Sequence, residues 1–120
     1  MARFVIQKHK ATHLHYDFRL EMEGVLRSWA VPKGLPERQG IKRLAVAVED
    51  HPLDYIDFEG VIPEGQYGAG VVEIWDKGEY EIESAEERKL VFNIKGKRIK
   101  GRYALIHTKG KNWLIFKLGF

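Results

Sequence analysis

The most constraining feature of this sequence is a near-continuous series of short segments rich in β-branched and aromatic residues. Several segments alternate apolar and polar residues with a period of two, the pattern of a strand with one buried face. Eight segments are predicted as strands: 4–9, 15–22, 25–32, 43–50, 70–83, 89–96, 102–109 and 113–118. The chain is therefore predicted to be all-β and mostly antiparallel, a compact, closed or nearly closed barrel of about eight strands.

Glycine-containing dipeptides favour tight connections at four points: Glu23-Gly24, Lys77-Gly78, Lys95-Gly96 and Lys109-Gly110. Two longer irregular stretches, 33–42 and 51–70, interrupt the strand pattern. Only 84–89 offers a capped helical start, for one turn at most. Since the 120 residues contain no linker or repeat, residues 1–120 are expected to form one domain.

Composition narrows the possible classes of protein. A hydrophobic content of 44% with 31% charged residues is typical of a globular protein. The net charge of +3 is compatible with an anionic partner but does not require one. The absence of cysteine excludes disulfides and thiolate metal sites, and favours a reducing compartment. With no signal-peptide pattern and no apolar run of membrane length, we expect a cytoplasmic monomer without membrane association.

The segment HKATHLHYDFRLEMEG, residues 9–24, carries an unusual set of polar side chains. On a strand, residues two apart share a face, so one face carries His13, His15, Asp17, Arg19 and Glu21. A solvated polar face is the commoner explanation of such a pattern. However, imidazole and carboxylate groups about 6.5–7 Å apart at the backbone can converge on one ion, and suit Mn²⁺, Zn²⁺ or Fe²⁺.

A second group of charged and polar residues lies on another predicted strand, which starts with Lys42 and Arg43. Glu49 and His51 lie at its far end, and Pro52 then turns the chain out of the sheet. Tyr55 follows one short turn later. The glycine-rich sequence 63–70 is a weak signal for phosphate binding, because glycine at this density is also ordinary in turns.

Together these segments resemble a known family. FVIQKHKATHLHYDFRLEMEGVLRSWAVPKGLP, followed by KRLAVAVEDHPLDYIDFEGVIPEGQYGAGVVEIWDKG, is similar to the 3′-phosphoesterase module of bacterial DNA ligase D, which also occurs as free-standing proteins. The match covers about residues 4–78, and the last third of the chain matches more loosely. The resemblance implies a compact β-barrel that binds a divalent metal, typically manganese. It also implies an enzyme that removes a 3′-phosphate or a 3′-terminal ribonucleoside from DNA or RNA strands, leaving a 3′-hydroxyl.

Site residues follow from matching the family's motifs position by position. The resemblance implies His9, His15 and Asp17 as the metal ligands, whereas strand pattern alone placed His9 only on the adjoining strand. It implies phosphate-binding and catalytic roles for Arg19, His51 and Tyr55. Further basic and acidic positions of the site match Lys33, Arg43 and Glu49. His13 and His107 are interpreted as structural or solvent-facing.

These assignments predict a mechanism and a set of partners. Mn²⁺, or alternatively Zn²⁺ or Co²⁺, is the expected cofactor, and Arg19 with Tyr55 is expected to bind phosphate oxygens. His51 is expected to act as a general acid or as a phosphate clamp. The substrates would be 3′ ends of primer-template strands, with a separate DNA ligase and polymerase as possible partners. Family modules carry an arm before the first strand that assists removal of the nucleoside. Because eight residues precede His9, we expect no such arm and a less certain diesterase activity.

Two other classes of protein remain as alternatives. A cupin-like metal oxygenase also places two histidines and a carboxylate on barrel strands, and His13 with His15 would supply its His-x-His pair. A non-catalytic nucleic-acid-binding barrel would instead present exposed aromatic rings over a basic groove. The tryptophans at 29, 75 and 113 fall in strand patterns that predict core positions, which disfavours the second alternative.

Overall fold

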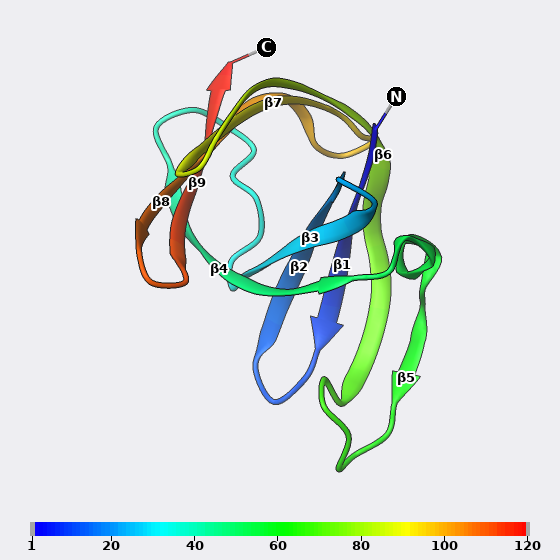
Figure 1. Ribbon diagram of the computed structural model, residues 1–120. Helices are drawn as coiled ribbons and strands as arrows, with labels where there is room; N and C mark the ends of the chain where they lie inside the picture. The colour runs from blue at the N-terminus through cyan, green and yellow to red at the C-terminus, as the bar shows by residue number, and fades with distance from the viewer. Residues whose placement is uncertain (1, 120) are drawn as a thin grey trace.

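A computed structural model describes residues 2–119 as an antiparallel β-barrel (Figure 1). Its strands are β1 (Ala2–Lys10), β2 (Leu14–Met22), β3 (Val25–Val31), β4 (Lys42–His51), β5 (Gly60–Ile62), β6 (Gly70–Glu86), β7 (Lys89–Lys95), β8 (Lys100–Lys109) and β9 (Asn112–Gly119). One short 3-10 helix, η1 (Leu53–Asp57), follows β4. No helix within residues 2–119 has the length and apolar character needed to cross a bilayer.

Eight of the nine strands close the barrel. They pair in the order β1-β2-β3-β4-β9-β8-β7-β6, and β6 pairs back to β1 to complete the ring. The short strand β5 lies outside the ring, paired with the first residues of the long strand β6 (Figure 1). The prediction of a closed antiparallel barrel of about eight strands is therefore confirmed, and each of the eight predicted segments corresponds to one strand of the ring.

Three local predictions were wrong. The segment predicted as a helical turn, 84–89, contains the end of β6, a tight turn and the start of β7, because Ser84 and Ala85 pair with the facing strand. A single helical turn costs too much to nucleate where strand pairing is available. The predicted connection at Lys77-Gly78 lies inside β6, where a Cβ on Gly78 would collide with the Lys95 carbonyl oxygen. The stretch 51–70, predicted as irregular, contains η1 and β5.

The barrel interior is a single apolar core. Alternate residues of β2, such as Phe18 and Leu20, point into it and are fully buried, as is Trp29 on β3. Trp113 is also buried and Trp75 packs at the core's margin, so the tryptophans lie where the strand pattern predicted. The long connection between β3 and β4 adds Leu35 to the core.

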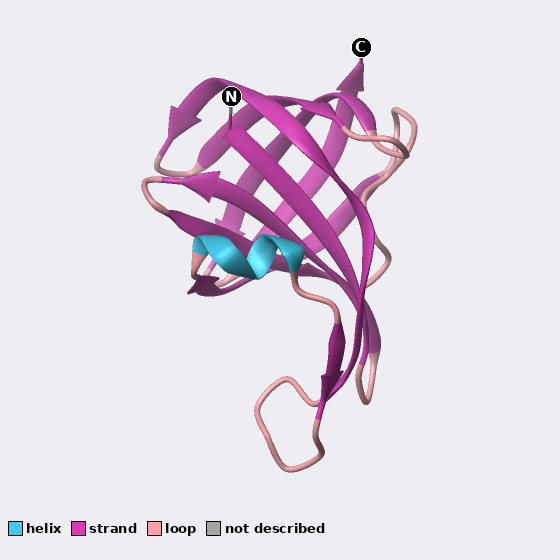
Figure 2. Ribbon diagram, turned by 90° about the vertical axis from the view of Figure 1, so that its right-hand side faces the viewer, coloured by secondary structure: helices cyan, strands magenta, loops and turns pink. Residues whose placement is uncertain are grey.

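A second, smaller apolar cluster covers part of the outer face of the same barrel wall. Val5 of β1 and Leu26 of β3 pack there against Ile56 of η1. Figure 2 shows η1 lying across the outside of the strands, with β5 and its following loop extending away from the barrel. Because these segments cover the outer face, residues of β1 and β2 that alternate with core residues are also buried. This second layer of burial creates the enclosed polar site described next.

Candidate active site

The polar residues singled out in the sequence meet around one cavity on the outer face of β1–β4. The cavity has a volume of about 560 Å³ and lies between the β4–η1 segment and the loop after β5. The predicted site residues that line it are His9, His15, Asp17, Arg19, Glu49, His51 and Tyr55. Asp17 and Arg19 are only 6% and 3% exposed, so this face of β2 is not a solvated polar surface.

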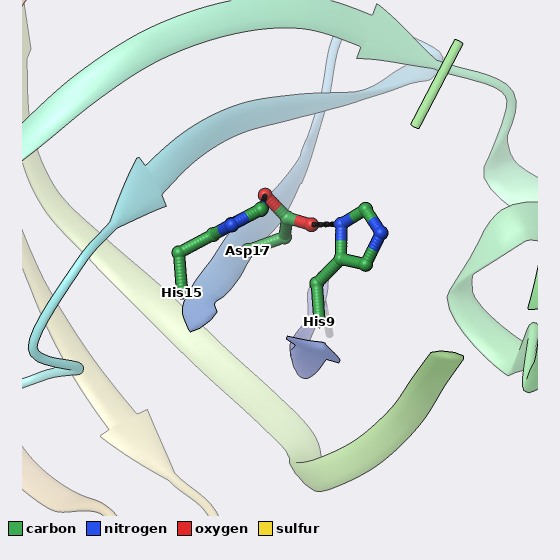
Figure 3. Close-up of side chains that lie close together, drawn as sticks. All are labelled: His9, His15 and Asp17. Carbon is green, nitrogen blue, oxygen red and sulfur yellow. Dashed lines mark ion pairs between the residues drawn. The ribbon is translucent and has the colours of Figure 1, made fainter. Parts of the chain in front are cut away.

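Three potential metal ligands converge at one end of the cavity. His9 and His15 are direct cross-strand neighbours of β1 and β2, and Asp17 lies two residues further along β2. The imidazole rings flank the carboxylate from two sides (Figure 3). Nδ1 of His9 lies 3.4 Å from Oδ2 of Asp17, and Nε2 of His15 lies 3.2 Å from Oδ1. One potential ligand atom from each residue lies within 4.8 Å of the other two.

The backbone fixes the tautomer of His15. Its Nδ1 lies 3.1 Å from the carbonyl oxygen of His13, which can only accept a hydrogen bond. With a proton on Nδ1, the ring can offer Nε2, the nitrogen nearest Asp17, to a metal ion, whereas in the metal-free protein a second proton on Nε2 can donate to the Asp17 carboxylate. His13 itself lies in the bend before β2, with an exposed side chain outside the potential metal group. The His-x-His pair of the cupin-like alternative is therefore not assembled.

The titration of His15 and Asp17 reflects their contact. The hydrogen bond with Asp17 raises the pKa of His15 above 6.5, although burial opposes the shift. Burial by itself would raise the pKa of Asp17, but the hydrogen bond from His15 and the charge of Arg19 outweigh it and lower that pKa. The carboxylate is thus anionic at neutral pH and available to a cation.

The donor set fits a divalent metal ion. Nδ1 of His9 faces the Asp17 carboxylate, and its Nε2 is buried with no hydrogen-bond partner among the described residues. Two imidazole nitrogens and one carboxylate oxygen are suitable ligands for Mn²⁺, Zn²⁺, Co²⁺ and Fe²⁺ alike. His9, His15 and Asp17 could therefore hold such an ion, whose identity the donor types alone do not select.

Arg19 lines the cavity between Asp17 and Tyr55. Its Nε donates a 2.6 Å hydrogen bond to Oε1 of Gln7, and one terminal nitrogen lies 3.5 Å from Oδ2 of Asp17. Its guanidinium carbon lies 5.0 Å from the centre of the Tyr55 ring, a cation–π contact. These contacts fix a charged planar fork beside the potential metal ligands, as bidentate binding of a phosphate requires.

Gln7 is a site residue that sequence reasoning missed. It is fully buried, and its Nε2 donates hydrogen bonds of 3.0 and 3.2 Å to the carbonyl oxygens of Tyr55 and Phe58. Gln7 thereby ties the middle and the C-terminal end of η1 to Arg19 on β2. Gln7 lies two residues before His9 on the same strand, so the period of two could have placed both side chains on one face.

His51 and Tyr55 form the opposite side of the cavity. The Tyr55 ring lies 4.6 Å from the His51 ring and stacks on Phe58 at 4.8 Å and 11°. Nδ1 of His51 lies 3.0 Å from the Glu49 carbonyl oxygen and 3.2 Å from an Arg19 nitrogen. One Nδ1 cannot donate to the first and accept from the second simultaneously, so the two contacts require different tautomers of the neutral ring.

Local charge and burial determine the protonation of this pair. Burial, followed by the positive charge of Arg19, lowers the pKa of His51 below 6.5. Burial also raises the pKa of Tyr55 above 10, so its hydroxyl remains a neutral donor at physiological pH. In the free protein at neutral pH, His51 is therefore an uncharged imidazole beside a charged guanidinium.

Two of the predicted residues lie outside the cavity lining. The Arg43 side chain donates hydrogen bonds of 2.7 and 3.2 Å to the carbonyl oxygens of Lys33 and Gly34, in the connection between β3 and β4. Lys33 is exposed, and neither side chain contributes to the lining. The structure thus brings seven of the nine predicted positions together, and substrate contacts by Lys33 and Arg43 remain predictions.

Residues 7–107 match the family model of the DNA ligase D 3′-phosphoesterase domain. The chain belongs to this family. The prediction from the sequence motifs is thereby confirmed, and the match extends past residue 78 to include β7 and most of β8. Membership in the 3′-phosphoesterase family supports a hydrolase role in processing strand ends, and suggests use of a metal.

Individual relatives align along almost the whole chain. A multifunctional non-homologous end joining protein LigD from Mycobacterium bovis is 54% identical over 119 residues, which cover 96% of this chain. The LigD proteins of Mycolicibacterium smegmatis and Pseudomonas aeruginosa are 51% and 50% identical, over 97% and 98% of the chain. The aligned regions are 16%, 17% and 15% of these relatives, so the 3′-phosphoesterase domain spans about a sixth of their length.

Proposed function

We propose that this 3′-phosphoesterase domain is a divalent-metal-dependent enzyme that heals 3′ ends of DNA or RNA strands. It removes a 3′-phosphate, a 3′-terminal ribonucleoside, or both in succession, and leaves a 3′-hydroxyl. The observation that carries this proposal is the clustering of the potential ligands His9, His15 and Asp17 beside Arg19 in one cavity. Such a site can neutralise and orient a phosphate group whose oxygens otherwise repel a nucleophile.

His9, His15 and Asp17 are proposed to hold the metal, with Mn²⁺ as the favoured ion and Zn²⁺ or Co²⁺ as alternatives. When bound, a divalent ion supplies Lewis-acid stabilisation of the charge on phosphate oxygens. Arg19 supplies a second positive group, and its fork would bind two phosphate oxygens at once. The Tyr55 hydroxyl, held neutral by its raised pKa, would donate one further hydrogen bond.

In the monoesterase step, the oxygen of a water molecule forms a bond to phosphorus and the bond to the 3′ oxygen of the strand breaks. In the diesterase step, the bond that breaks joins phosphorus to the 5′ oxygen of the terminal nucleoside. The departing oxygen needs a proton in each step. His51 is proposed to donate it, because burial and the Arg19 charge lower its pKa and the negative charge of an approaching phosphate group would offset the Arg19 charge. A pure clamping role for His51 is the alternative within this proposal.

The biological setting of this activity is also proposed. The relatives named as multifunctional non-homologous end joining proteins suggest that this domain prepares ends for joining. Its partners would be the 3′ ends of primer-template strands, a polymerase and a DNA ligase. The natural location for such work is the cytoplasm, in agreement with the cysteine-free composition.

An assay on end-labelled primers tests the proposal. Primers that end in a 3′-phosphate and primers that end in one ribonucleotide are incubated with and without Mn²⁺, and the products are separated on a gel. We expect Mn²⁺-dependent release of phosphate, suppressed by a chelator and by the Asp17→Asn substitution. Inert 3′-phosphate primers at every metal concentration would contradict the proposed function.

A further inference from the structure

The loop after β5 forms the side of the cavity next to the potential metal ligands. Two backbone hydrogen bonds shape it, from the nitrogen of Gln66 to the Pro63 carbonyl at 3.3 Å and from that of Ala69 to the Gln66 carbonyl at 3.2 Å. Gly68 adopts a φ of +77°, and a Cβ built on it would lie 3.9 Å from Cε1 of His9. The loop is therefore folded against His9 at the rim of the cavity.

Tyr67 lies on this loop and projects into solvent while lining the cavity. Its exposed fraction is 84%, the highest among the exposed large apolar and aromatic residues of the described chain. Within residues 2–119 its side chain makes no ring contact or hydrogen bond, and it interacts electrostatically with Arg19. Because Tyr67 also lines the cavity, its exposed ring is available for stacking to a ligand that enters there.

The second tyrosine of the cavity differs in this respect. The Tyr55 ring is in contact with His51, Phe58 and the Arg19 guanidinium, so its faces are occupied within the protein. Of the two tyrosines that line the cavity in residues 2–119, Tyr67 is therefore the one whose ring faces are free to stack on a ligand. A nucleobase that entered this cavity would find its stacking partner at the loop rather than at η1.

The size and walls of the cavity also exceed the needs of a phosphate group. A volume of about 560 Å³ is typical of pockets that hold small organic ligands. Alongside the polar groups, small or apolar side chains form much of the wall: Ala11, Ala30, Val48, Ile62 and Ala69. These residues leave room beside Arg19 for a ribose and a base.

We infer that Tyr67 stacks on the base of the terminal ribonucleoside, the group that departs in the diesterase step. This inference rests on the proposed function and assigns the leaving nucleoside to the loop after β5. For its phosphate to reach the buried Asp17 and Arg19, the terminal nucleoside must turn away from the base stack of the strand. Tyr67 would replace the stacking that the base loses, independently of base identity.

The two activities of the proposed enzyme then depend differently on Tyr67. A 3′-phosphate substrate has no terminal nucleoside beyond the phosphate, so it has nothing to place on the ring. Base–aromatic stacking corresponds to a loss of about 5- to 150-fold on alanine substitution. We expect Tyr67→Ala to lower kcat/KM for nucleoside removal by this factor and to change 3′-phosphate removal about twofold at most. Tyr67→Phe, which keeps the ring, should retain both.

The experiment compares wild type, Tyr67→Ala, Tyr67→Phe and Val61→Ala. Val61 is a matched control because it is 71% exposed on β5 and lies outside the cavity lining. Each protein is assayed on primers ending in one ribonucleotide, in an abasic ribose, or in a 3′-phosphate. The abasic end should react slowly with wild type, and Tyr67→Ala should slow it no further. Val61→Ala should match wild type on every primer.

Several outcomes would overturn the inference. Equal losses on ribonucleotide and 3′-phosphate primers would place Tyr67 in a role common to both steps. Unchanged nucleoside removal by Tyr67→Ala, a loss with Tyr67→Phe equal to that with alanine, or no nucleoside removal by wild type would each contradict stacking. Failure of wild type to release 3′-phosphate would instead contradict the proposed function, so the two failures remain distinguishable.

Discussion

Two aspartates are buried in this barrel, and their surroundings differ completely. Asp76, on β6, is 4% exposed and accepts hydrogen bonds of 2.8–3.1 Å from the backbone nitrogens of Lys77, Lys97, Arg98 and Ile99. Asp17, on β2, is 6% exposed and forms ion-pair contacts with the side chains of His9, His15 and Arg19. Both carboxylates are satisfied, but one by fixed amides and the other by ionisable groups.

The difference separates a structural carboxylate from a functional one. The amide donors of the β7–β8 turn cannot leave Asp76 without breaking the turn. This interaction therefore stabilises the fold, and a metal ion or ligand cannot readily replace these donors. The proton shared by Asp17 and His15 can be replaced by a metal ion without moving the backbone. Burial of an acidic residue therefore indicates function here only when its partners can be exchanged.

The largest effect is expected from removing the exchangeable carboxylate. Asp17→Asn keeps the shape and removes the charge, so Mn²⁺ affinity should fall by more than the roughly 10- to 100-fold typical for loss of a residue that merely supports a ligand. Phosphatase turnover should fall with it. Calorimetric titration with Mn²⁺ measures the first and the gel assay measures the second. Wild-type affinity would remove Asp17 from the metal site.

Removal of His51 should separate turnover from metal binding. His51→Ala is expected to lower kcat by about 10²–10⁴-fold, the range for loss of general acid catalysis, while Mn²⁺ affinity remains close to that of wild type. Stopped assays at saturating Mn²⁺, together with calorimetry, distinguish the two quantities. Normal turnover would contradict both the acid and the clamp role.

Substitution of Asp76, the structural carboxylate, should lower stability without changing Mn²⁺ affinity. Asp76→Asn replaces one accepting oxygen by an NH₂ group that faces backbone donors, so the free energy of unfolding should fall by about 2–4 kcal/mol. Mn²⁺ affinity of the folded variant should be unchanged. Urea unfolding followed by tryptophan fluorescence measures the stability, with Asp17→Asn as the matched comparison. A larger loss of stability in Asp17→Asn than in Asp76→Asn would break the distinction.

A smaller loss is expected when Arg19 keeps its charge but loses its planar fork. Arg19→Lys cannot bind two phosphate oxygens and also donate to Gln7, so kcat/KM should fall by roughly 10- to 100-fold, equivalent to about one hydrogen bond involving a charged group. Steady-state kinetics on 3′-phosphate primers measures the loss. Substitution of the exposed Arg38 by lysine is the control, and equal activity of the two variants would refute the clamp.

The smallest expected effect is a pH dependence of stability and of Mn²⁺ affinity that arises at Asp17 and not at Asp76. Because the folded pKa of His15 is raised above 6.5, its ion pair with Asp17 stabilises the metal-free fold fully below pH 6.5, and this contribution is lost as pH rises through the folded pKa. At low pH the contribution of Asp17, whose pKa is lowered, is lost as pH falls through that pKa. As pH rises, Mn²⁺ affinity should increase while the stabilisation from the His15–Asp17 ion pair decreases.

Protons and metal compete for His15, so Mn²⁺ affinity should fall by at most about tenfold per pH unit as pH drops below the raised pKa. Calorimetric titrations between pH 5.5 and 8 test this dependence. Thermal unfolding of the metal-free protein over the same range tests the loss of the ion pair. An Mn²⁺ affinity that stays constant across this range would show that no histidine with this pKa is a ligand.

The amino-acid sequence by itself predicted the eight strands of the ring and the two faces of β2. A period of two follows from local backbone geometry, so it placed Phe18 inward and placed His15, Asp17 and Arg19 together on the opposite face before any tertiary structure was known. The family motifs added His9, and they gave His51 and Tyr55, already noted from the sequence, their expected roles. The same parity rule misplaced His13, because β2 begins at Leu14.

Tertiary structure alone decided which distant residues complete the site. The register of β1 against β2 sets His9 opposite His15, and packing of η1 on the outer face buries Arg19 and engages Gln7. The partners of Asp76 and the position of Tyr67 beside His9 likewise depend on turns and loops remote in sequence. Local alternation cannot encode these relations, because register and the covering of a face arise from long-range pairing and packing.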